Sequence, residues 1–300
     1  MLAHVPAHRA KDWGLLAILV ALWGSNFMFI KLGVETVPPA TLVAARLAIG
    51  AAIMVATVRA MGHVFPPPGR QWLPYLAVAI LGNALPFWAI TWGQQYLESA
   101  LAGILMAVMP LATLVLAHFF VAGEAMTRLR LAGFVLGFAG IVVLMGPAAL
   151  HGLGGSAMEV LAQISVLAGA LCYALQTIVV RRSLTGNLMV ASAGILLLAA
   201  LISLPVALVV DRPWTLSPSP LSVAVVIWIG IGPTALATIV FLRLIGSAGP
   251  SFMALTNYCV PIVALFLGTA LLGEAPGTGA YAGLALILSG IAISQLSRRH

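Results

Sequence analysis

The chain contains ten apolar runs, each close to the length of about 20 residues that an α-helix needs to cross a lipid bilayer. Short joints rich in Pro, Gly and Ser separate the runs, and these are turn-forming compositions. Because 62% of the residues are hydrophobic and only 7% are charged, the chain cannot cover itself with a polar surface. The pattern predicts an all-α membrane protein with ten transmembrane helices, at about residues 13–32, 40–60, 72–93, 99–121, 129–147, 160–180, 188–210, 221–242, 250–272 and 278–296.

The distribution of basic residues predicts the orientation in the membrane. With ten crossings, eleven of the 14 Lys and Arg residues fall on the side of the N-terminus. Lys31 and Arg212 fall on the opposite side, and Arg46 lies within the second run. Since cytoplasmic loops carry the excess of basic residues, both termini are predicted to be cytoplasmic. The same distribution accounts for the net charge of +7 without a basic patch, so we expect no nucleic-acid partner.

A weak internal repeat appears when the sequence is shifted by 150 residues. Gly123-Glu124-Ala125 then matches Gly273-Glu274-Ala275, and eight of the nineteen positions from 123 to 141 are identical. The shift divides the chain into two repeats, residues 1–150 and 151–300, with Gly152 to Gly155 as the linker. Five spans per repeat is an odd number, so the second repeat has the opposite orientation. Inverted repeats are typical of secondary transporters, although channels and intramembrane enzymes also contain repeats.

Several short motifs resemble those of the EamA-type drug/metabolite transporters. They are Trp23-Gly24-Ser25-Asn26 followed by Lys31, Pro38-Pro39 before Arg46, Pro110, and Gly-Glu at 123–124 and 273–274. The chain is most similar to bacterial amino-acid exporters of the YddG type. The resemblance implies ten helices in two inverted five-helix repeats around a central cavity, alternating access in a bacterial inner (plasma) membrane, and a small metabolite as substrate. In the second half Cys172-Tyr173-Ala174-Leu175-Gln176 replaces the Trp23 motif, and no basic residue corresponds to Arg46.

Polar and aromatic side chains at membrane depth are the candidates for substrate binding, because they are costly there and mark function. For Asn and Gln the alternative is an interhelical hydrogen bond. Arg46 has three possible roles. It snorkels to the membrane interface, it pairs with Glu98 at the external entrance of the cavity, or it contacts a carboxylate of the substrate. The candidates are Trp23, Asn26, Arg46, Asn83, Phe87, Trp88, Tyr173, Gln176, Asn257 and Tyr258.

Four prolines inside predicted spans are candidate hinges: Pro86, Pro110, Pro233 and Pro261. Each removes one backbone donor and displaces the carbonyl four residues earlier. These carbonyls belong to Gly82, Met106, Ile229 and Asn257. Free carbonyls near the midplane could contact a substrate, and the alternative is a simple kink that lets helices pack.

The remaining chemistry of the sequence favours transport over catalysis. All seven acidic residues fall at span ends or in joints, so no midplane carboxylate relay is predicted. No nucleophile with a base, metal-ligand spacing or phosphate-binding loop is present, so we expect no enzyme activity, cofactor or metal. Small-residue spacings at Gly133–Gly137 and Gly279–Gly283 fit packing within the bundle or a dimer face, so the chain is expected to be a monomer or weak homodimer.

These features together predict a secondary transporter. It exports aromatic and other neutral amino acids, or related small metabolites, by facilitation or exchange. The alternatives are a multidrug or amphiphile exporter of the same fold, or a non-transporting membrane enzyme or scaffold.

Overall fold

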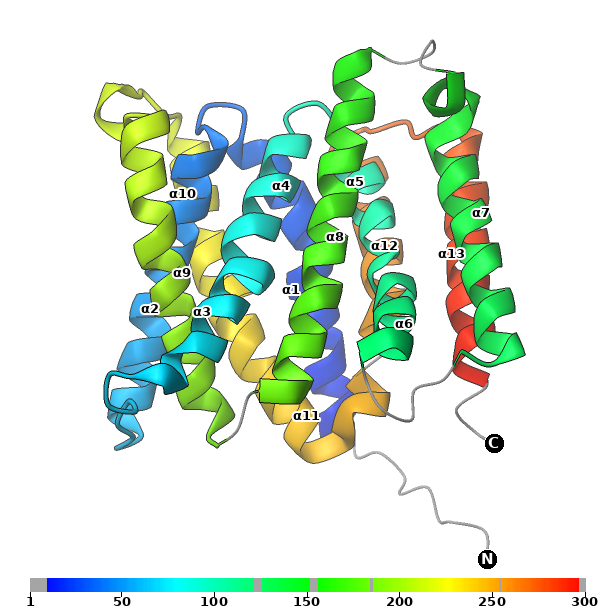
Figure 1. Ribbon diagram of the computed structural model, residues 1–300. Helices are drawn as coiled ribbons and strands as arrows, with labels where there is room; N and C mark the ends of the chain where they lie inside the picture. Colours follow the sequence, from blue (N-terminus) through cyan, green and yellow to red (C-terminus); the bar gives the residue numbers. More distant parts are fainter. Residues whose placement is uncertain (1–9, 121–125, 152–155, 184–185, 254, 297–300) are drawn as a thin grey trace, which may run out of the picture.

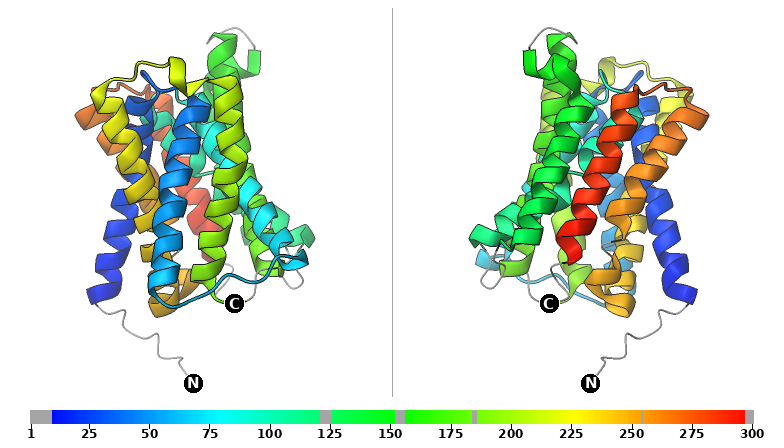
Figure 2. Two further views of the ribbon diagram at one scale, coloured as in Figure 1. Left: turned by 90° about the vertical axis from the view of Figure 1, so that its left-hand side faces the viewer. Right: turned by 90° about the vertical axis from the view of Figure 1, so that its right-hand side faces the viewer.

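The computed structural model describes residues 10–120, 126–151, 156–183, 186–253 and 255–296, and every regular element in these ranges is a helix (Figure 1). Since lipid offers no hydrogen bonds to backbone groups, a chain this apolar pairs them within helices. The helices run side by side, and the first turn of α1 lies at the same end of the bundle as the last turn of α13 (Figures 1 and 2). The predicted Gly123-Glu124-Ala125 motif and the Gly152 to Gly155 linker lie outside the described residues.

The elements in chain order are α1 (Ala10–Gly33), α2 (Pro39–Ala60), η1 (Arg70–Trp72), α3 (Leu73–Ala79), η2 (Ile80–Ala84), α4 (Leu85–Gly93), α5 (Ser99–Met106), α6 (Met109–Phe120), α7 (Arg128–His151), α8 (Ala157–Ser183), α9 (Leu188–Val210), η3 (Pro213–Thr215), α10 (Pro220–Ile229), η4 (Gly230–Leu236), α11 (Ala237–Met253), α12 (Thr256–Leu271) and α13 (Thr278–Leu296).

Within the described ranges, seven helical stretches are long and apolar enough to cross a membrane, and two further apolar helices, Thr256–Leu271 and Thr278–Ser294, are shorter. The predicted run at 250–272 differs from the structure at its start. Gly249, at φ 81°, kinks the end of α11, and α12 begins only at Thr256. The seven stretches are Ala10–Gly33, Pro39–Ala60, Arg70–Gly93, Ser99–Phe120, Ala157–Val180, Leu188–Val210 and Pro220–Gly249.

Local sequence explains where several helices begin. α2 begins at Pro39, whose fixed φ suits the first helical position and whose missing N–H needs no partner there. The Asn187 side chain accepts hydrogen bonds from the backbone N–H groups of Met189 and Val190, so it caps α9. The Ser219 hydroxyl accepts from the Ser222 N–H and caps α10 in the same way.

Two of the long stretches contain a π-helical segment. η2 precedes Pro86, the second residue of α4, and η4 contains Pro233. η2 begins at Ile80 and η4 begins at Gly230, 150 residues later, which is the offset of the internal repeat. A proline removes one backbone donor, and a widened turn is one way for a helix to accommodate that loss. Segments of this kind occur frequently at functional sites.

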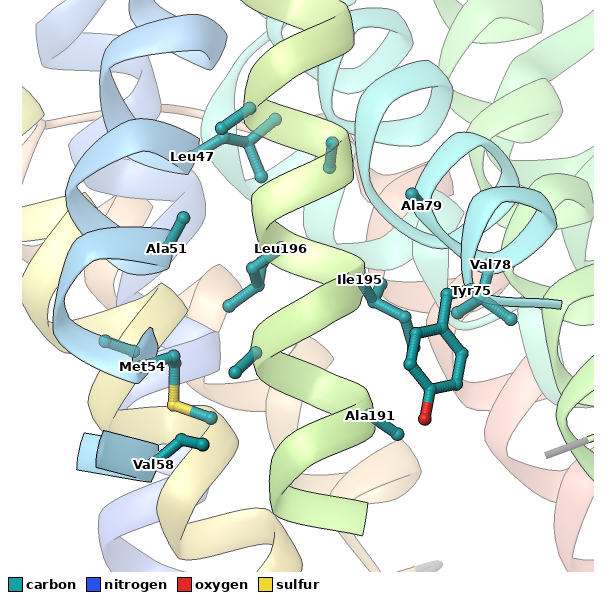
Figure 3. Packing of buried hydrophobic residues seen from close by; sticks show 14 of the residues in the cluster. Leu47, Ala51, Met54, Val58, Tyr75, Val78, Ala79, Ala191, Ile195 and Leu196 are labelled. Atoms are coloured by element: carbon teal, nitrogen blue, oxygen red, sulfur yellow. The ribbon is translucent and has the colours of Figure 1, made fainter. Parts of the chain in front are cut away.

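The largest apolar cluster joins α2, α3 and α9 (Figure 3). Leu47, Ala51, Met54 and Val58 follow one face of α2 at helical spacing, and they pack against residues of α9 that include Leu196. α7 and α13 form a separate close pair at one edge of the bundle (Figure 1). A Cβ at Gly290 of α13 would overlap the backbone of Gly133, so the small residues serve packing within this chain.

Helices from the first and second halves of the sequence are interleaved. α1 packs against α10, α11 and α12, and α8 packs against α4, α5 and α6. α2 also contacts the π-helical segment η4. The two halves therefore meet along helices that carry most of the predicted site residues.

Candidate functional site

Arg46 of α2 is buried between the two halves, with 2% of its surface exposed. Its Nε and Nη2 groups both donate to Thr234 Oγ1 of η4, at 3.2 and 3.1 Å. Its Cζ atom lies 3.9 Å from the centroid of the Phe87 ring on α4, a cation–π contact. Tyr173 of α8 is near enough to interact with the charge electrostatically. Elements from both halves thus surround one guanidinium.

The hydroxyl of Thr234 is oriented by the adjacent proline. Pro233 has no N–H to donate and displaces the carbonyl of Ile229 from the regular ladder. The Thr234 hydroxyl donates to that Ile229 oxygen at 2.9 Å, which leaves its lone pairs for Arg46. The Ile229 carbonyl is one of the four that lie four residues before an in-span proline. The local backbone irregularity therefore creates the acceptor that holds Arg46.

The charge of Arg46 has no acidic partner among the residues that the structure describes. Its contacts there are the Thr234 hydroxyl and the Phe87 ring, and Tyr173 interacts with its charge electrostatically. The side chain does not snorkel, because it is buried, and it forms no ion pair with Glu98. Both of these alternatives for Arg46 are therefore wrong in this conformation.

Gln176 and Gly82 form a second close contact between the halves. A Cβ atom built on Gly82 of η2 would lie 2.6 Å from the Gln176 Cδ of α8, so a larger residue at position 82 would push the Gln176 side chain aside. Asn83, the next residue of η2, is half-buried. Gln176 stands 150 residues after Asn26, and Tyr173 stands 150 residues after Trp23, the offset that also relates η2 to η4.

The other predicted binding residues are distributed more widely. Asn26 of α1 is half-buried, and its Oδ1 is buried without a hydrogen-bond partner. Trp23 packs against Phe241 of α11, with ring centroids 5.7 Å apart. Asn257 and Tyr258 lie half-buried in the first turn of α12.

Trp88 of α4 does not contact Arg46. It is 43% exposed and stacks on Trp92, with ring centroids 6.3 Å apart. Phe87, the preceding residue, projects to a different side of the helix and contacts the guanidinium. Consecutive residues of a helix point about 100° apart, which explains the different environments.

The four prolines differ in what they do to their helices. Pro86 follows η2, and Pro233 lies inside η4. Pro110 follows a break, since α5 ends at Met106 and α6 begins at Met109. Pro261 lies inside α12, which continues through it. Three of the four thus accompany an irregular backbone, and their role as hinges stays a prediction.

Lys31 and Gln94, near the opposite end of the bundle from Ala10, join α1 to the chain that follows α4. Lys31 donates from Nζ to the carbonyls of Gln94 and Leu97, at 3.1 and 2.8 Å, beyond the last turn of α4. Gln94, fully buried, donates from Nε2 to the Phe27 carbonyl of α1 at 2.8 Å.

The Gly273-Glu274 motif caps a helix of the other half. Gly273, at φ 66°, ends α12 in the left-handed region, and the Glu274 N–H bonds back to the Gly268 carbonyl. The Glu274 carboxylate then accepts from the N–H groups of Ser99 and Ala100, at 2.7 and 2.9 Å, and from the Ser99 hydroxyl at 3.0 Å. It satisfies two of the free backbone donors in the first turn of α5.

Comparison with known proteins identifies the family. The chain matches the EamA-like transporter family over residues 12–146 and again over residues 160–296. It is 26% identical over 287 residues to a protein named "Uncharacterized inner membrane transporter YedA" from Escherichia coli (strain K12), covering 95% of this chain and 91% of that protein. It is 28% identical over 284 residues to "Uncharacterized transporter YvbV" from Bacillus subtilis (strain 168), covering 93% and 90%.

A solved crystal structure shares the fold at a TM-score of 0.69, covering 97% of this chain and 98% of its own. At 22% identity this likeness concerns the fold alone. The two family matches together cover most of the sequence. This chain belongs to the EamA-like transporter family.

Proposed function

We propose that the protein exports aromatic and other neutral amino acids, or related small metabolites, across a bacterial inner membrane by alternating access. Ten segments span the membrane in two inverted repeats, residues 1–150 and 151–300, with both termini in the cytoplasm. The observation that carries this proposal is the pair of π-helical segments, η2 and η4, which lie 150 residues apart. Each meets the opposite half through a polar side chain, Gln176 at η2 and Arg46 at η4.

Matched irregular segments at the contact between repeats fit an alternating mechanism. Secondary transporters with inverted repeats bind substrate between the halves, on helices that are interrupted near the midplane. A rocking motion of one half against the other would change the Gly82–Gln176 and Arg46–Thr234 contacts. The same end of the bundle holds the first turn of α1 and the last turn of α13, as an even number of crossings requires (Figure 1).

The predicted site residues, taken together, support amino acids as substrates. Trp23, Phe87 and Tyr173 offer aromatic surface, and Asn26 and Gln176 offer amide groups. Such a mixture suits molecules with an apolar side chain and a small polar head. The similarity to exporters of the YddG type favours the same class. Because no carboxylate is predicted at midplane depth, we infer that substrate gradients drive transport.

Exchange measurements in proteoliposomes test the proposed function. Vesicles that contain the purified protein are preloaded with labelled phenylalanine, methionine or threonine and challenged outside with unlabelled amino acids or hydrophobic cations. Release that is selective for amino acids is expected. Release by cations alone would assign the protein to drug export, and accumulation driven only by an imposed proton gradient would contradict gradient-driven exchange.

A further inference from the structure

We propose that Arg46 binds the carboxylate of the transported molecule, so that transport requires an anionic group and does not require an ammonium group. The inference rests on the proposed function and names the recognition chemistry at the contact between the two halves. Its basis is the burial of a permanent charge that has only neutral partners among the described residues.

The first step concerns the energy of that charge. A guanidinium stays protonated in proteins, so burial does not remove the charge. An isolated buried charge is costly, and ionisable groups inside a membrane are normally paired or lie along a substrate path. A threonine hydroxyl and a phenylalanine ring offset only part of the cost, because neither carries a full negative charge. An anion at Arg46 would supply the missing compensation.

The second step concerns the geometry of the free donors. Arg46 has five N–H groups, and Thr234 Oγ1 bridges the edge formed by Nε and Nη2. The Phe87 ring covers a face of the guanidinium rather than its edge. The edge formed by Nη1 and Nη2 is therefore left for an acceptor in the guanidinium plane. A carboxylate binds such an edge through two parallel hydrogen bonds.

The third step concerns what holds the Arg46 guanidinium in place. Thr234 is fixed by its own hydrogen bond to the Ile229 carbonyl, and Phe87 restricts rotation out of plane. A guanidinium that is already held in position loses little conformational freedom when the anion binds. Lys31, by comparison, is already engaged with two carbonyls in the connection between α4 and α5. The two cations thus have different roles, one structural and one available to a ligand.

The fourth step concerns which anions fit. Phe87 lies against the guanidinium and offers apolar ring surface there, and Tyr173 of α8 is near enough to interact with the charge. This surface favours carboxylates that carry an apolar or aromatic group over a small inorganic ion. Chloride shares the charge of a carboxylate, but it cannot form the paired planar contact. The test therefore separates these two sources of negative charge.

The experiment uses the full-length protein in proteoliposomes preloaded with labelled phenylalanine. External competitors are phenylalanine, 3-phenylpropionate, which lacks the ammonium, and phenylalaninamide and phenethylamine, which lack the carboxylate. We expect the first two to compete and the last two to be at least about 10-fold weaker, since a charge-assisted pair contributes on that scale. Equal competition by the amide and by phenylalanine would overturn the inference. So would an equal effect of chloride and phenylpropionate, because Arg46 would then serve an inorganic anion.

Variants connect this selectivity to Arg46. Arg46→Gln should raise the half-saturating phenylalanine concentration about 10-fold to 100-fold and abolish the preference for acid over amide. Arg46→Lys should retain part of the preference, because it keeps the charge but not the planar fork. Arg59→Gln is the matched control, since Arg59 is an exposed arginine at the end of the same helix. An unchanged preference for acid over amide in Arg46→Gln would refute the assignment.

A binding measurement on the unaltered protein covers the case in which the variants do not fold. Thermal stabilisation in detergent is compared for 3-phenylpropionate, phenethylamine and chloride at matched ionic strength. Stabilisation by the acid alone supports the anion site, and equal stabilisation by acid and amine contradicts it. If no amino acid is exchanged by the wild type, the proposed function fails, and this binding result still decides the role of Arg46.

Discussion

Replacing Glu274 with glutamine should weaken the attachment of α12 to α5. The substitution is nearly isosteric, but it removes the negative charge and one of the two acceptor oxygens. In the native contact these oxygens accept two backbone N–H groups and one hydroxyl from Ser99 and Ala100. The amide nitrogen of glutamine would face donors instead of accepting from them. The first turn of α5 has no other side-chain cap in the described structure, because Glu98 at its N-cap position forms none.

The expected loss follows from these contacts. A hydrogen bond to a charged group contributes about 1.5–3 kcal/mol, and loss of an N-cap costs about 0.5–2 kcal/mol. Because Glu274 is only half-buried, screening reduces the upper figure. We expect a loss of about 1–2 kcal/mol in the free energy of unfolding.

Reversible unfolding in SDS micelles measures this free energy for the wild type, Glu274→Gln and a control. Glu159→Gln is the matched control, since Glu159 is an exposed glutamate in the first turn of α8, and it should change stability by less than about 0.5 kcal/mol. Ser99→Ala should leave most of the Glu274→Gln effect in place, because two of the three bonds involve backbone donors. Equal stability of Glu274→Gln and Glu159→Gln would refute the capping role.

Three further predictions concern close contacts and pH. Gly82→Ala should lower stability by less than about 1 kcal/mol, because the added methyl meets only the flexible Gln176 side chain, which can move aside. Adding Gln176→Ala should remove even this loss in the same unfolding assay, and a loss that survives the second change would show that Gln176 is not the obstacle. Gly290→Ala should cost about 1–3 kcal/mol, because the added methyl meets the backbone of Gly133, which cannot move aside as easily. Gly14→Ala, in open space, should cost nothing, and equal effects of Gly290→Ala and Gly14→Ala would disprove the close approach. Burial raises the pKa of Glu98, and the Glu274 carboxylate adds to the rise while the Ala275 backbone and Lys31 oppose it. A carboxyl group whose pKa is raised in the folded state stabilises the fold at low pH, and this contribution is lost as the pH rises through the raised value. Glu98→Gln should therefore be more stable than the wild type at about pH 8 and gain little at about pH 4. A constant difference in stability across this range would contradict the shift.

Sequence periodicity predicts the helices well because each run must satisfy its own backbone in lipid. The runs at 40–60 and 188–210, for example, coincide closely with α2 (Pro39–Ala60) and α9 (Leu188–Val210). The prolines identify where a helix is irregular, but they do not distinguish the π-helical turn at Pro233 from the uninterrupted helix through Pro261. That distinction depends on packing around each turn, which a single sequence does not contain.

The side-chain contacts of the charged residues are the part that sequence reasoning misses. Lys31 meets carbonyls more than 60 residues away, and Glu274 meets backbone donors about 175 residues away. Both contacts depend on how separate helices are placed, so the local pattern suggests only an interfacial lysine and a Gly-Glu turn. Arg46 is identified as a candidate because a charge at membrane depth is unusual, but its partner Thr234 depends on the rotation of two helices.

The single arginine makes the two repeats chemically unequal. The residue 150 positions after Arg46 is Leu196, which is 4% exposed and packs in the apolar cluster between α9 and α2. Of these two equivalent positions only the one in the first half carries a charge, and Thr234 of the second half holds it. When the site is empty, any change of the α2–η4 contact must move a buried charge that lacks a counter-ion. A bound carboxylate compensates that charge, so the loaded protein changes conformation at a lower electrostatic cost than the empty one. We therefore expect exchange of substrate for substrate to be faster than net efflux, and this difference requires no protonatable group at the midplane.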